Sequence, residues 1–368
     1  MEIHKNKILM VVIWNMGIGG IQKRLRDIIK EIITNHPNIK IHLLVKTKQP
    51  NYFIPNSPKS SKLKIYYFSS KKYRLSSIPF IFWATFHFFK IKPNICLTFL
   101  DYLSIILICI KYLFFWRKTK IVLNEGILTS DYLKIHRKNP IWKYLIKLTY
   151  QFANTIIVPT IYCKKDLIKN FNIPNKIITI IPNWTLIKIQ SPKKNPIYDL
   201  IYIGRLEKEK RPLLLIKIIK RLKKKFPNIS LCIIGNGSQL PLVKKAIKKL
   251  NLSKNIILLN YQKNIVPYLK KSKIFILFSK NEGMPNVILE ASICQIPSII
   301  NNFKGSNLVI KHKKTGYIFQ NTTQMISQVK KLLINRKLRL KLGKQAQIFI
   351  KKSSSKHLQK QFIQILLK

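Results

Sequence analysis

Two glutamates in this 368-residue chain are spaced so that their carboxylates could bind one ligand from two directions. Glu282 follows an apolar run in a predicted loop, and Glu290 lies about one turn inside the helix that Pro285 is suited to begin. The first amides of such a helix can bind an anion, and each carboxylate can accept hydrogen bonds from a pair of hydroxyls. The residues that lead into this helix are Gly283, Met284, Pro285 and Asn286. The pattern favours a ligand made of two sugar rings joined by a diphosphate.

A second loop, from Gly204 to Pro212, places two cations between a predicted strand and a predicted helix. Arg205 offers a planar fork of donors to a phosphate, and Lys210 adds a compact charge. Together they could neutralise a diphosphate leaving group without a metal ion. Most of the 69 lysines and arginines are expected to be solvated, so the position in this loop is what singles out these two.

Glycines mark two further loops that follow predicted strands. The first contains Gly19 and Gly20, which would let the backbone approach a phosphate or a sugar closely. Gln22 stands where a dinucleotide-binding fingerprint has its third glycine, so a nicotinamide site is disfavoured. The second loop contains Gly235 and Gly237 and could border a nucleotide.

Several motifs of other enzyme classes are missing from the sequence. It contains no Asp-x-Asp pair, no His/Cys cluster with metal-binding spacing, no G-x-S-x-G and no phosphate-loop lysine. We therefore expect neither a metal ion nor a cofactor. The five cysteines are far apart and mostly lie in apolar runs, which is typical of buried thiols in a reducing compartment.

The run from Glu282 to Ala291 resembles the E-x7-E signature of glycosyltransferase family 4, and the run from Gly204 to Lys210 is similar to that family's G-R-L-x-x-x-K element. The resemblance implies that Glu282 contacts the donor sugar and that Glu290 contacts the ribose diol of a nucleotide sugar. It also implies a GT-B fold, in which two Rossmann-like domains face each other across a cleft. The implied reaction needs no metal, retains the anomeric configuration and uses the two loop cations to stabilise the leaving phosphate.

The first half of the chain departs from the family pattern. Many members place a histidine near the reacting sugar after the fourth strand, whereas Asn124 and Glu125 stand there in this sequence. Glu125 could contact the acceptor or act as its base, or it could be a structural carboxylate bound to a lysine. Asp101, at the end of another predicted strand, is a further candidate for acceptor binding. Because this histidine is missing, the chain could also be a degenerate transferase, one that has lost part of the catalytic machinery.

Short apolar runs alternate with segments of helical period, which predicts parallel strands joined by crossover helices and therefore an α/β fold. A polar stretch with two prolines, 189–197, is the predicted linker. We expect an N-terminal acceptor-binding domain at 1–190, a C-terminal donor-binding domain at 191–345, and a terminal helix at 346–368 that packs back on the first domain. The apolar segment 95–116 contains two charges, so we expect a strand at 95–99 followed by a buried helix instead of a membrane span.

The formal net charge of +57 is spread along the whole chain. Such dispersion is typical of solvated surfaces, so we do not expect nucleic acid as a partner. The excess would still attract the protein to an anionic membrane surface. The segment from Ile78 to Phe89 combines aromatic residues with flanking lysines, which suits a membrane-facing patch or a core helix equally well. We expect a cytoplasmic protein that is peripheral on the inner face of the cell membrane.

The residues, together with what the family resemblance implies, predict a retaining transferase of a hexose or N-acetylhexosamine. The donor would be a nucleotide-diphosphate sugar, with UDP preferred because of the family resemblance, and the acceptor a glycan or polyprenyl-linked saccharide. Two other functions stay open. A sugar-nucleotide epimerase would share the architecture without needing an acceptor, and a non-catalytic polyanion-binding protein would account for the charge but not for the paired loops.

Overall fold

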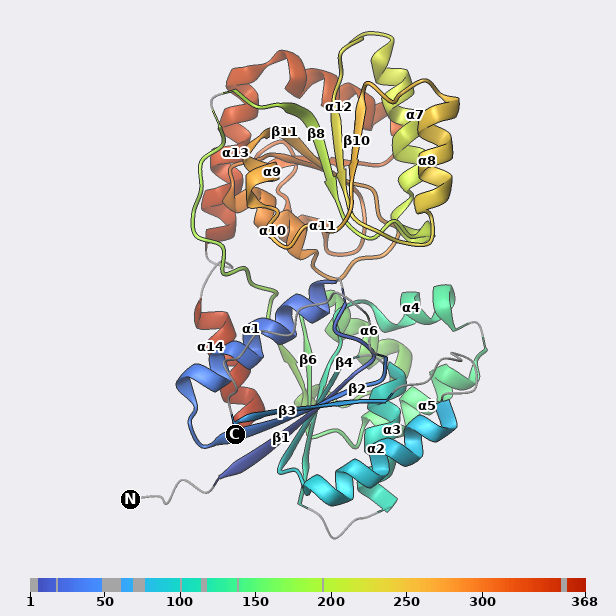
Figure 1. Ribbon diagram of the computed structural model, residues 1–368, viewed down its shortest axis with the longest axis vertical. Coiled ribbons are helices and arrows are strands. Elements are labelled where there is room, and N and C mark those ends of the chain that lie inside the picture. Colours follow the sequence, from blue (N-terminus) through green and yellow to red (C-terminus); the bar gives the residue numbers. More distant parts are fainter. Residues whose placement is uncertain are drawn as a thin grey trace. The chain divides into compact units, whose positions relative to one another are not determined.

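The computed structural model describes residues 6–17, 19–47, 61–68, 77–99, 101–113, 118–137, 139–193, 195–351 and 356–368, with the side chains of Ser77 and Asp101 outside the description. The chain forms two units, each with its own parallel sheet (Figure 1). The first unit contains Met1–Pro182 together with Gln359–Lys368, and the second contains Asn183–Leu358.

The first unit is built on a seven-stranded sheet with the order β3-β2-β1-β4-β5-β6-β7. Its strands are β1 (Lys7–Ile13), β2 (Ile39–Val45), β3 (Leu63–Tyr67), β4 (Ile95–Phe99), β5 (Lys120–Asn124), β6 (Thr155–Val158) and β7 (Ile178–Ile180). Its helices are α1 (Gly20–Asn35), α2 (Ser77–Ile91), α3 (Asp101–Leu113), α4 (Thr129–His136), α5 (Ile141–Tyr150), α6 (Ile161–Phe171), the 3-10 turn η1 (Asn175–Ile177) and the terminal α14 (Lys356–Leu367). The strand order reverses direction between β1 and β4, and the carboxyl ends of all seven strands meet at one edge.

The second unit is built on a six-stranded parallel sheet with the order β10-β9-β8-β11-β12-β13. Its strands are β8 (Tyr198–Ile203), β9 (Leu231–Ile234), β10 (Ile256–Leu259), β11 (Ser272–Leu277), β12 (Ser298–Asn301) and β13 (Gly316–Phe319). Its helices are η2 (Lys208–Lys210), α7 (Pro212–Lys223), α8 (Leu240–Lys249), α9 (Val266–Lys270), α10 (Asn286–Ile293), α11 (Ser306–Val309), α12 (Thr322–Ile334) and α13 (Arg336–Lys351). Figure 1 shows α7 and α8 on one side of this sheet and α9, α10 and α13 on the other.

Burial on both faces explains why the strands are continuous apolar runs. All five residues of β4 are buried, and so are the last five of β1. The helices instead bury one stripe: Leu25, Ile28 and Ile32 recur on α1 at helical spacing and have no exposed surface. The α6 helix begins where the Thr160 hydroxyl accepts a bond from the Cys163 amide at 3.1 Å.

The predicted α/β class with two Rossmann-like domains is confirmed, and segment 95–116 begins as predicted with a strand and a buried helix. Two strands, β3 and β13, were missing from the sequence-based prediction. Within the described residues, no helix is long and apolar enough to span a membrane.

The domain limits differ from those expected at 190 and 345. The first boundary lies at Pro182, ahead of the polar stretch 189–197. The second expected boundary falls inside α13, which stays with the second unit because Gln347 Nε2 donates to the carbonyl oxygens of Gln190 at 2.9 Å and Ile293 at 2.6 Å. Only the last helix, α14, belongs to the first unit, so the predicted return at 346–368 is restricted to α14.

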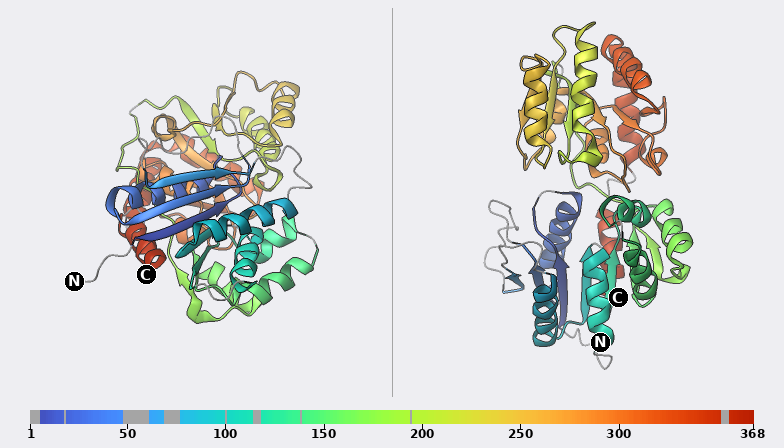
Figure 2. Two further views of the ribbon diagram at one scale, coloured as in Figure 1. Left: turned by 60° about the horizontal axis from the view of Figure 1, so that its bottom comes forward. Right: turned by 90° about the vertical axis from the view of Figure 1, so that its right-hand side faces the viewer.

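The α14 helix is held on the first unit at both of its ends, and Figures 1 and 2 show it lying against this unit. Near its start, Gln359 Nε2 donates to the carbonyl oxygen of Asp27 at 2.8 Å. Near its end, Lys120 Nζ donates to the carbonyl oxygen of Ile365 at 2.5 Å and Lys7 Nζ to that of Leu367 at 3.0 Å. The last carbonyls of a helix have no partner within the helix and carry partial negative charge, so two ammonium groups stabilise this end.

Replacing Lys120 with Met should loosen α14 without unfolding the sheet. Loss of a charged hydrogen bond of about 1.5–3 kcal/mol corresponds to roughly ten- to hundredfold faster amide exchange. Hydrogen exchange of the 356–368 peptide, read by mass spectrometry, checks this expectation. The exposed neighbour Lys118 provides the control variant Lys118→Met. If the 356–368 peptide exchanged at the same rate in both variants, the role given to Lys120 would be contradicted.

Candidate active site

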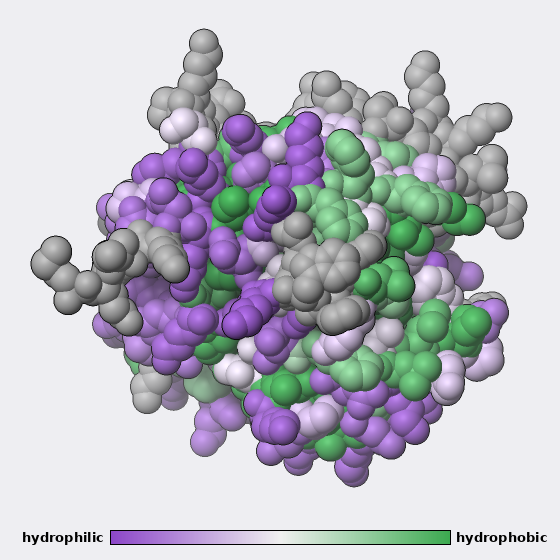
Figure 3. Space-filling model, turned by 90° about the horizontal axis from the view of Figure 1, so that it is seen from below, coloured by the Kyte–Doolittle hydropathy of each residue, from purple (hydrophilic) through white to green (hydrophobic). Residues whose placement is uncertain are grey.

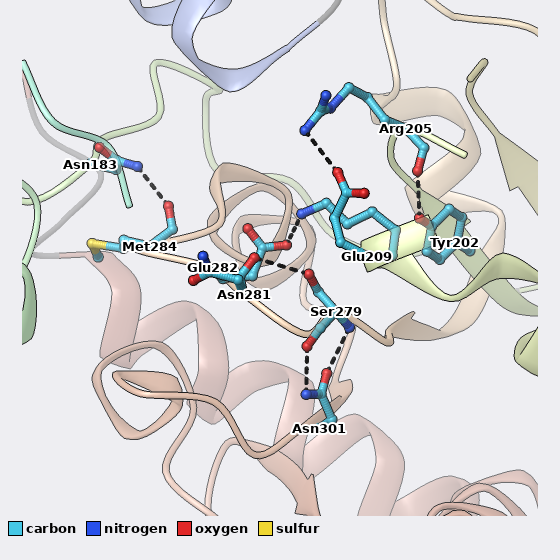
Figure 4. Close-up of polar contacts among 10 residues, drawn as sticks. Asn183, Tyr202, Arg205, Glu209, Ser279, Asn281, Glu282, Met284 and Asn301 are labelled. Carbon is cyan, nitrogen blue, oxygen red and sulfur yellow. Dashed lines mark hydrogen bonds and ion pairs between the residues drawn. The ribbon is translucent and has the colours of Figure 1, made fainter. Parts of the chain in front are cut away.

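The loop that carries Glu282 is anchored at both ends. Asn301, the last residue of β12, accepts a bond from the Ser279 amide at 2.8 Å and donates one to the Ser279 carbonyl oxygen at 2.6 Å (Figure 4). At the other end, Asn183 Nδ2 donates to the carbonyl oxygen of Met284 at 2.6 Å. The loop is therefore fixed in place before α10 begins.

An ion pair joins the two loops that were predicted to bind a diphosphate. Lys210 Nζ contacts Glu282 Oε1, and only 15% and 12% of these side chains are exposed. The loops also share a backbone bond of 2.9 Å from the Lys280 amide to the Glu209 carbonyl oxygen. Because an ammonium carries three N–H groups, Lys210 has two further donors besides the one directed at Glu282.

Arg205 lies on the same edge but is open to solvent. Its side chain is 53% exposed, and its guanidinium is 3.4 Å from Glu209, four residues further along the loop (Figure 4). The hydroxyl of Tyr202 donates to the Arg205 carbonyl oxygen at 3.1 Å. Burial, and to a smaller degree the charge of Glu282, raise the pKa of Tyr202, so this hydroxyl stays protonated and fixes the loop backbone.

The glycines of the G-x-G loop allow two backbones to pack against each other. Gly235 has φ +149°, and a Cβ at this position would lie 1.9 Å from the carbonyl oxygen of Gly204. A Cβ on Gly237 would lie 2.5 Å from the carbonyl oxygen of Leu206. The Leu206 amide in turn donates to the Asn236 carbonyl oxygen at 2.9 Å. These glycines are therefore required to hold in place the loop that contains Arg205, which we call the arginine loop, whatever they contribute to ligand binding.

The helix after the loop begins one residue later than Pro285, at Asn286. Pro285 has φ −68° and ψ 119°, so it precedes α10 instead of forming its first turn. Gly283 and Met284 are buried, while Asn286 is partly exposed at the start of the helix. Glu290 is only 3% exposed. The structure thus gives the two glutamates different surroundings, one in an ion pair between loops and one within the helix.

The remaining candidates lie in the first unit. Gly19 and Gly20 lie directly before and at the start of α1, in a loop where Asn15 Oδ1 accepts bonds from the Gly17 amide at 3.0 Å and from Gln22 Nε2 at 3.2 Å.

Asn124 and Glu125 follow at the end of β5, and both are buried. Glu125 Oε1 accepts a 2.7 Å bond from the Tyr150 hydroxyl, which gives this carboxylate a structural partner that the sequence did not suggest. Asp101 begins α3, and its side chain lies outside the description.

Sequence reasoning missed several residues that build the site. Glu207 accepts bonds from the Ser238 amide at 3.1 Å and hydroxyl at 2.5 Å, which ties the arginine loop to the loop after β9. Glu209 and Asn301 fix the two loops described above. A signal was present, because four of only seven glutamates fall in the second unit's loops and in α10. Among the described residues, no group of three or more His, Cys, Asp or Glu is placed to hold a metal ion.

Comparison with known proteins finds glycosyltransferases that are similar to this chain. Residues 185–349 match the family of glycosyl transferases group 1, which covers both loops, the G-x-G turn and α10. The resemblance to glycosyltransferases is thereby confirmed. The architecture is that of GT-B proteins: the chain is similar to sucrose-phosphate synthase from Thermosynechococcus elongatus, with a TM-score of 0.80, 12% identity and 98% of each chain covered.

The chain aligns with two relatives over different shares of their length. An uncharacterized glycosyltransferase of Methanocaldococcus jannaschii is 31% identical over 274 residues, which are 66% of this chain and 65% of that protein. The N-acetylgalactosamine-N,N'-diacetylbacillosaminyl-diphospho-undecaprenol 4-alpha-N-acetylgalactosaminyltransferase of Campylobacter jejuni is 25% identical over 351 residues, which are 90% of this chain and 91% of that protein. TarM of Staphylococcus aureus, solved with UDP, has a TM-score of 0.78 at 16% identity, with 98% of this chain and 100% of that chain covered.

Gly237→Ala should destabilise the second unit because the new methyl group would meet backbone atoms that cannot rotate away. We expect a loss of more than about 1 kcal/mol and a lower melting temperature in calorimetry. Gly126→Ala is the matched control, since its Cβ would meet no atom closer than 4.0 Å. The contact between the two loops would be in doubt if both variants melted at the temperature of the unchanged protein.

Proposed function

We propose that this protein is a retaining, metal-independent glycosyltransferase that moves a hexose or N-acetylhexosamine from a UDP-sugar to a lipid-linked or polysaccharide acceptor. The observation that carries the proposal is the Lys210–Glu282 ion pair, because it sets a cation and a carboxylate side by side at the end of parallel strands. Ligands of open α/β sheets bind at this edge. The similarity to TarM, which was solved with UDP, supports a UDP-sugar as donor. The similarity to the Campylobacter jejuni transferase, whose name includes diphospho-undecaprenol, supports a lipid-linked acceptor.

The roles follow from the chemistry of each group. Glu282 would accept hydrogen bonds from donor-sugar hydroxyls, and Glu290 would bind the ribose diol. Arg205 and Lys210 would neutralise the diphosphate as the bond from the anomeric carbon to the phosphate oxygen breaks. The acceptor hydroxyl then bonds to the anomeric carbon on the face that the diphosphate leaves, and its proton passes to the released phosphate oxygen. Positive charge on the sugar in the transition state favours nearby carboxylates.

The central test measures UDP release from a panel of UDP-sugars, with total membrane lipid extract as acceptor and EDTA present. Glu282→Ala and Glu290→Ala should each lower turnover by about a hundredfold or more, because preorganised polar groups contribute on this scale. Glu31→Ala removes a carboxylate from α1 and should leave turnover unchanged. Activity that requires added metal, or that survives both substitutions, would contradict the proposal.

The same assay separates the competing functions. An epimerase would convert the donor without lipid extract and release no UDP in proportion to acceptor. A polyanion-binding protein would consume no donor and would retain nucleic acid at high salt, because binding that resists salt requires more than counterion release.

We also propose that the first unit binds the anionic face of the membrane through α2 and α5. Ile78, Phe82 and Phe86 are 68%, 71% and 60% exposed and recur every fourth residue on α2. On α5, Ile141 and Tyr144 are 52% and 60% exposed. Figure 3 views this end of the first unit and contains a broad area of hydrophobic side chains. Exposed lysines on both helices would add attraction to anionic lipid.

Phe82→Ser combined with Phe86→Ser should weaken membrane binding. Losing two exposed aromatic anchors should lower the fraction that sediments with phosphatidylglycerol vesicles at low salt by roughly tenfold. Ile334→Ser with Ile348→Ser removes two exposed apolar residues, at 67% and 62%, from the second unit and is the control. Similar sedimentation of all three proteins would mean that lysines alone, or another surface, bind the vesicles.

A further inference from the structure

A group of cations and aromatic rings lies at the carboxyl edge of the first sheet, outside the sites described so far. Lys46 follows β2, Trp14 follows β1, and Tyr102 is in the first turn of α3 after β4. The strand order reverses between β1 and β4, and ligands of such sheets bind outside this point. We call Trp14, Lys46, Tyr102, Arg137 and Trp142 the aromatic–cation cluster.

Lys46 is the buried member of the cluster. Its side chain is 1% exposed, and its Nζ lies 4.0 Å from the centre of the Trp14 ring and 5.2 Å from those of Tyr102 and Phe80. Within the described part of the chain, no hydrogen-bond acceptor contacts this Nζ. Burial, together with the charge of Arg137, lowers the pKa of Lys46 to about 8. An ammonium in this position costs folding free energy that ring faces recover only in part.

Arg137 is the accessible cation of the cluster. It follows α4, is partly exposed, and its guanidinium lies 4.3 Å from the centre of the Trp142 ring and 5.9 Å from that of Tyr102. Tyr102 meets both Trp14 and Trp142 edge to face, with ring centres 6.1 Å apart in each pair. The rings thus form an unbroken series between the two cations.

The electrostatics of the cluster favour an anion. The one charged group that acts on the pKa of Lys46 in the described structure is another cation, Arg137. Both cations add positive potential at a ligand-binding edge, and that potential attracts an anion. The flat rings beside them offer apolar faces to whatever the anion is attached to.

We propose that the aromatic–cation cluster is the subsite for the phosphate or diphosphate group of the acceptor. This inference rests on the proposed function and adds to it the part of the acceptor that is recognised. Arg137 makes the direct contact, because its planar fork matches two phosphate oxygens. Lys46 is a positioning residue that holds Trp14 and Tyr102 and adds positive potential behind them. The rings of Tyr102 and Trp142 then border the sugar or prenyl chain next to the phosphate.

Tryptophan fluorescence tests the subsite, since two tryptophans belong to it. The full chain is titrated with farnesyl diphosphate, inorganic pyrophosphate and farnesol, with saturating UDP present to occupy the donor site. Farnesyl diphosphate should bind, and Arg137→Gln and Lys46→Met should each weaken it by at least about tenfold. Arg137→Lys should recover part of the loss, since it keeps the charge without the fork. The control variants Lys134→Gln on α4 and Lys40→Met on β2 each remove one exposed positive charge and should bind within about twofold of the unchanged protein.

The outcomes distinguish a free phosphate from a lipid-linked one, and failure of the subsite from failure of the proposed function. Equal binding of pyrophosphate and farnesyl diphosphate would mean that the phosphate is recognised without its lipid, and preference for farnesyl diphosphate would identify a lipid-linked group. Farnesol binding as tightly as its diphosphate, or Arg137→Gln binding normally, would overturn the subsite. Melting temperatures show whether Lys46→Met is folded, and we expect no decrease because Met fills the same space. If diphosphate binds as expected but no UDP-sugar is turned over, the proposed function fails and the anion subsite stands.

Discussion

The Lys210–Glu282 ion pair is the contact on which the second unit's site depends. It joins two loops that come from different strands, and both partners are largely shielded from water, so the attraction is stronger than at an open surface. Two other contacts position these loops. Asn301, at the end of β12, holds one through Ser279, and the glycine at 237 lets the other pack against its neighbour. A site made of flexible side chains is thereby held by a rigid backbone frame.

Much of the fold could be predicted because both sheets are parallel and buried on both faces. Such strands appear in sequence as uninterrupted apolar runs, as in Ile95–Phe99. The strand at Leu63–Tyr67 was missed because it lies at the sheet's edge and mixes polar with apolar residues, and the strand at Gly316–Phe319 begins with a glycine. The domain limits were misplaced for a similar reason: prolines and lysines after residue 189 suggest a linker, but pairing with Gln347 depends on distant residues.

Candidate residues could be chosen from sequence where a motif follows a predicted strand, but their contacts could not. Glu282 and Lys210 were chosen as candidates from their loops, and only the fold shows that they form an ion pair. Glu125 could not be assigned from sequence, because its partner Tyr150 lies 25 residues away with no distinguishing signal. Lys46 is similar to many other lysines in a chain with a net charge of +57, and only its burial among rings distinguishes it. Because lysines are spread along the whole chain, the sequence does not show which few of them are buried.

The position of α14 also bears on the order in which the protein can fold during synthesis. The first unit takes its last helix from the very end of the described chain, after the whole second unit has been made. While the ribosome is still translating, Asp27 and the amino ends of β1 and β5 therefore lack their contacts with α14, and the Arg24 guanidinium lacks the Phe362 ring that lies 4.9 Å from it in the finished unit. The second unit, which is continuous in sequence, can finish first. The first unit to emerge is thus the last to be completed, and chaperones have a defined interval in which to bind it.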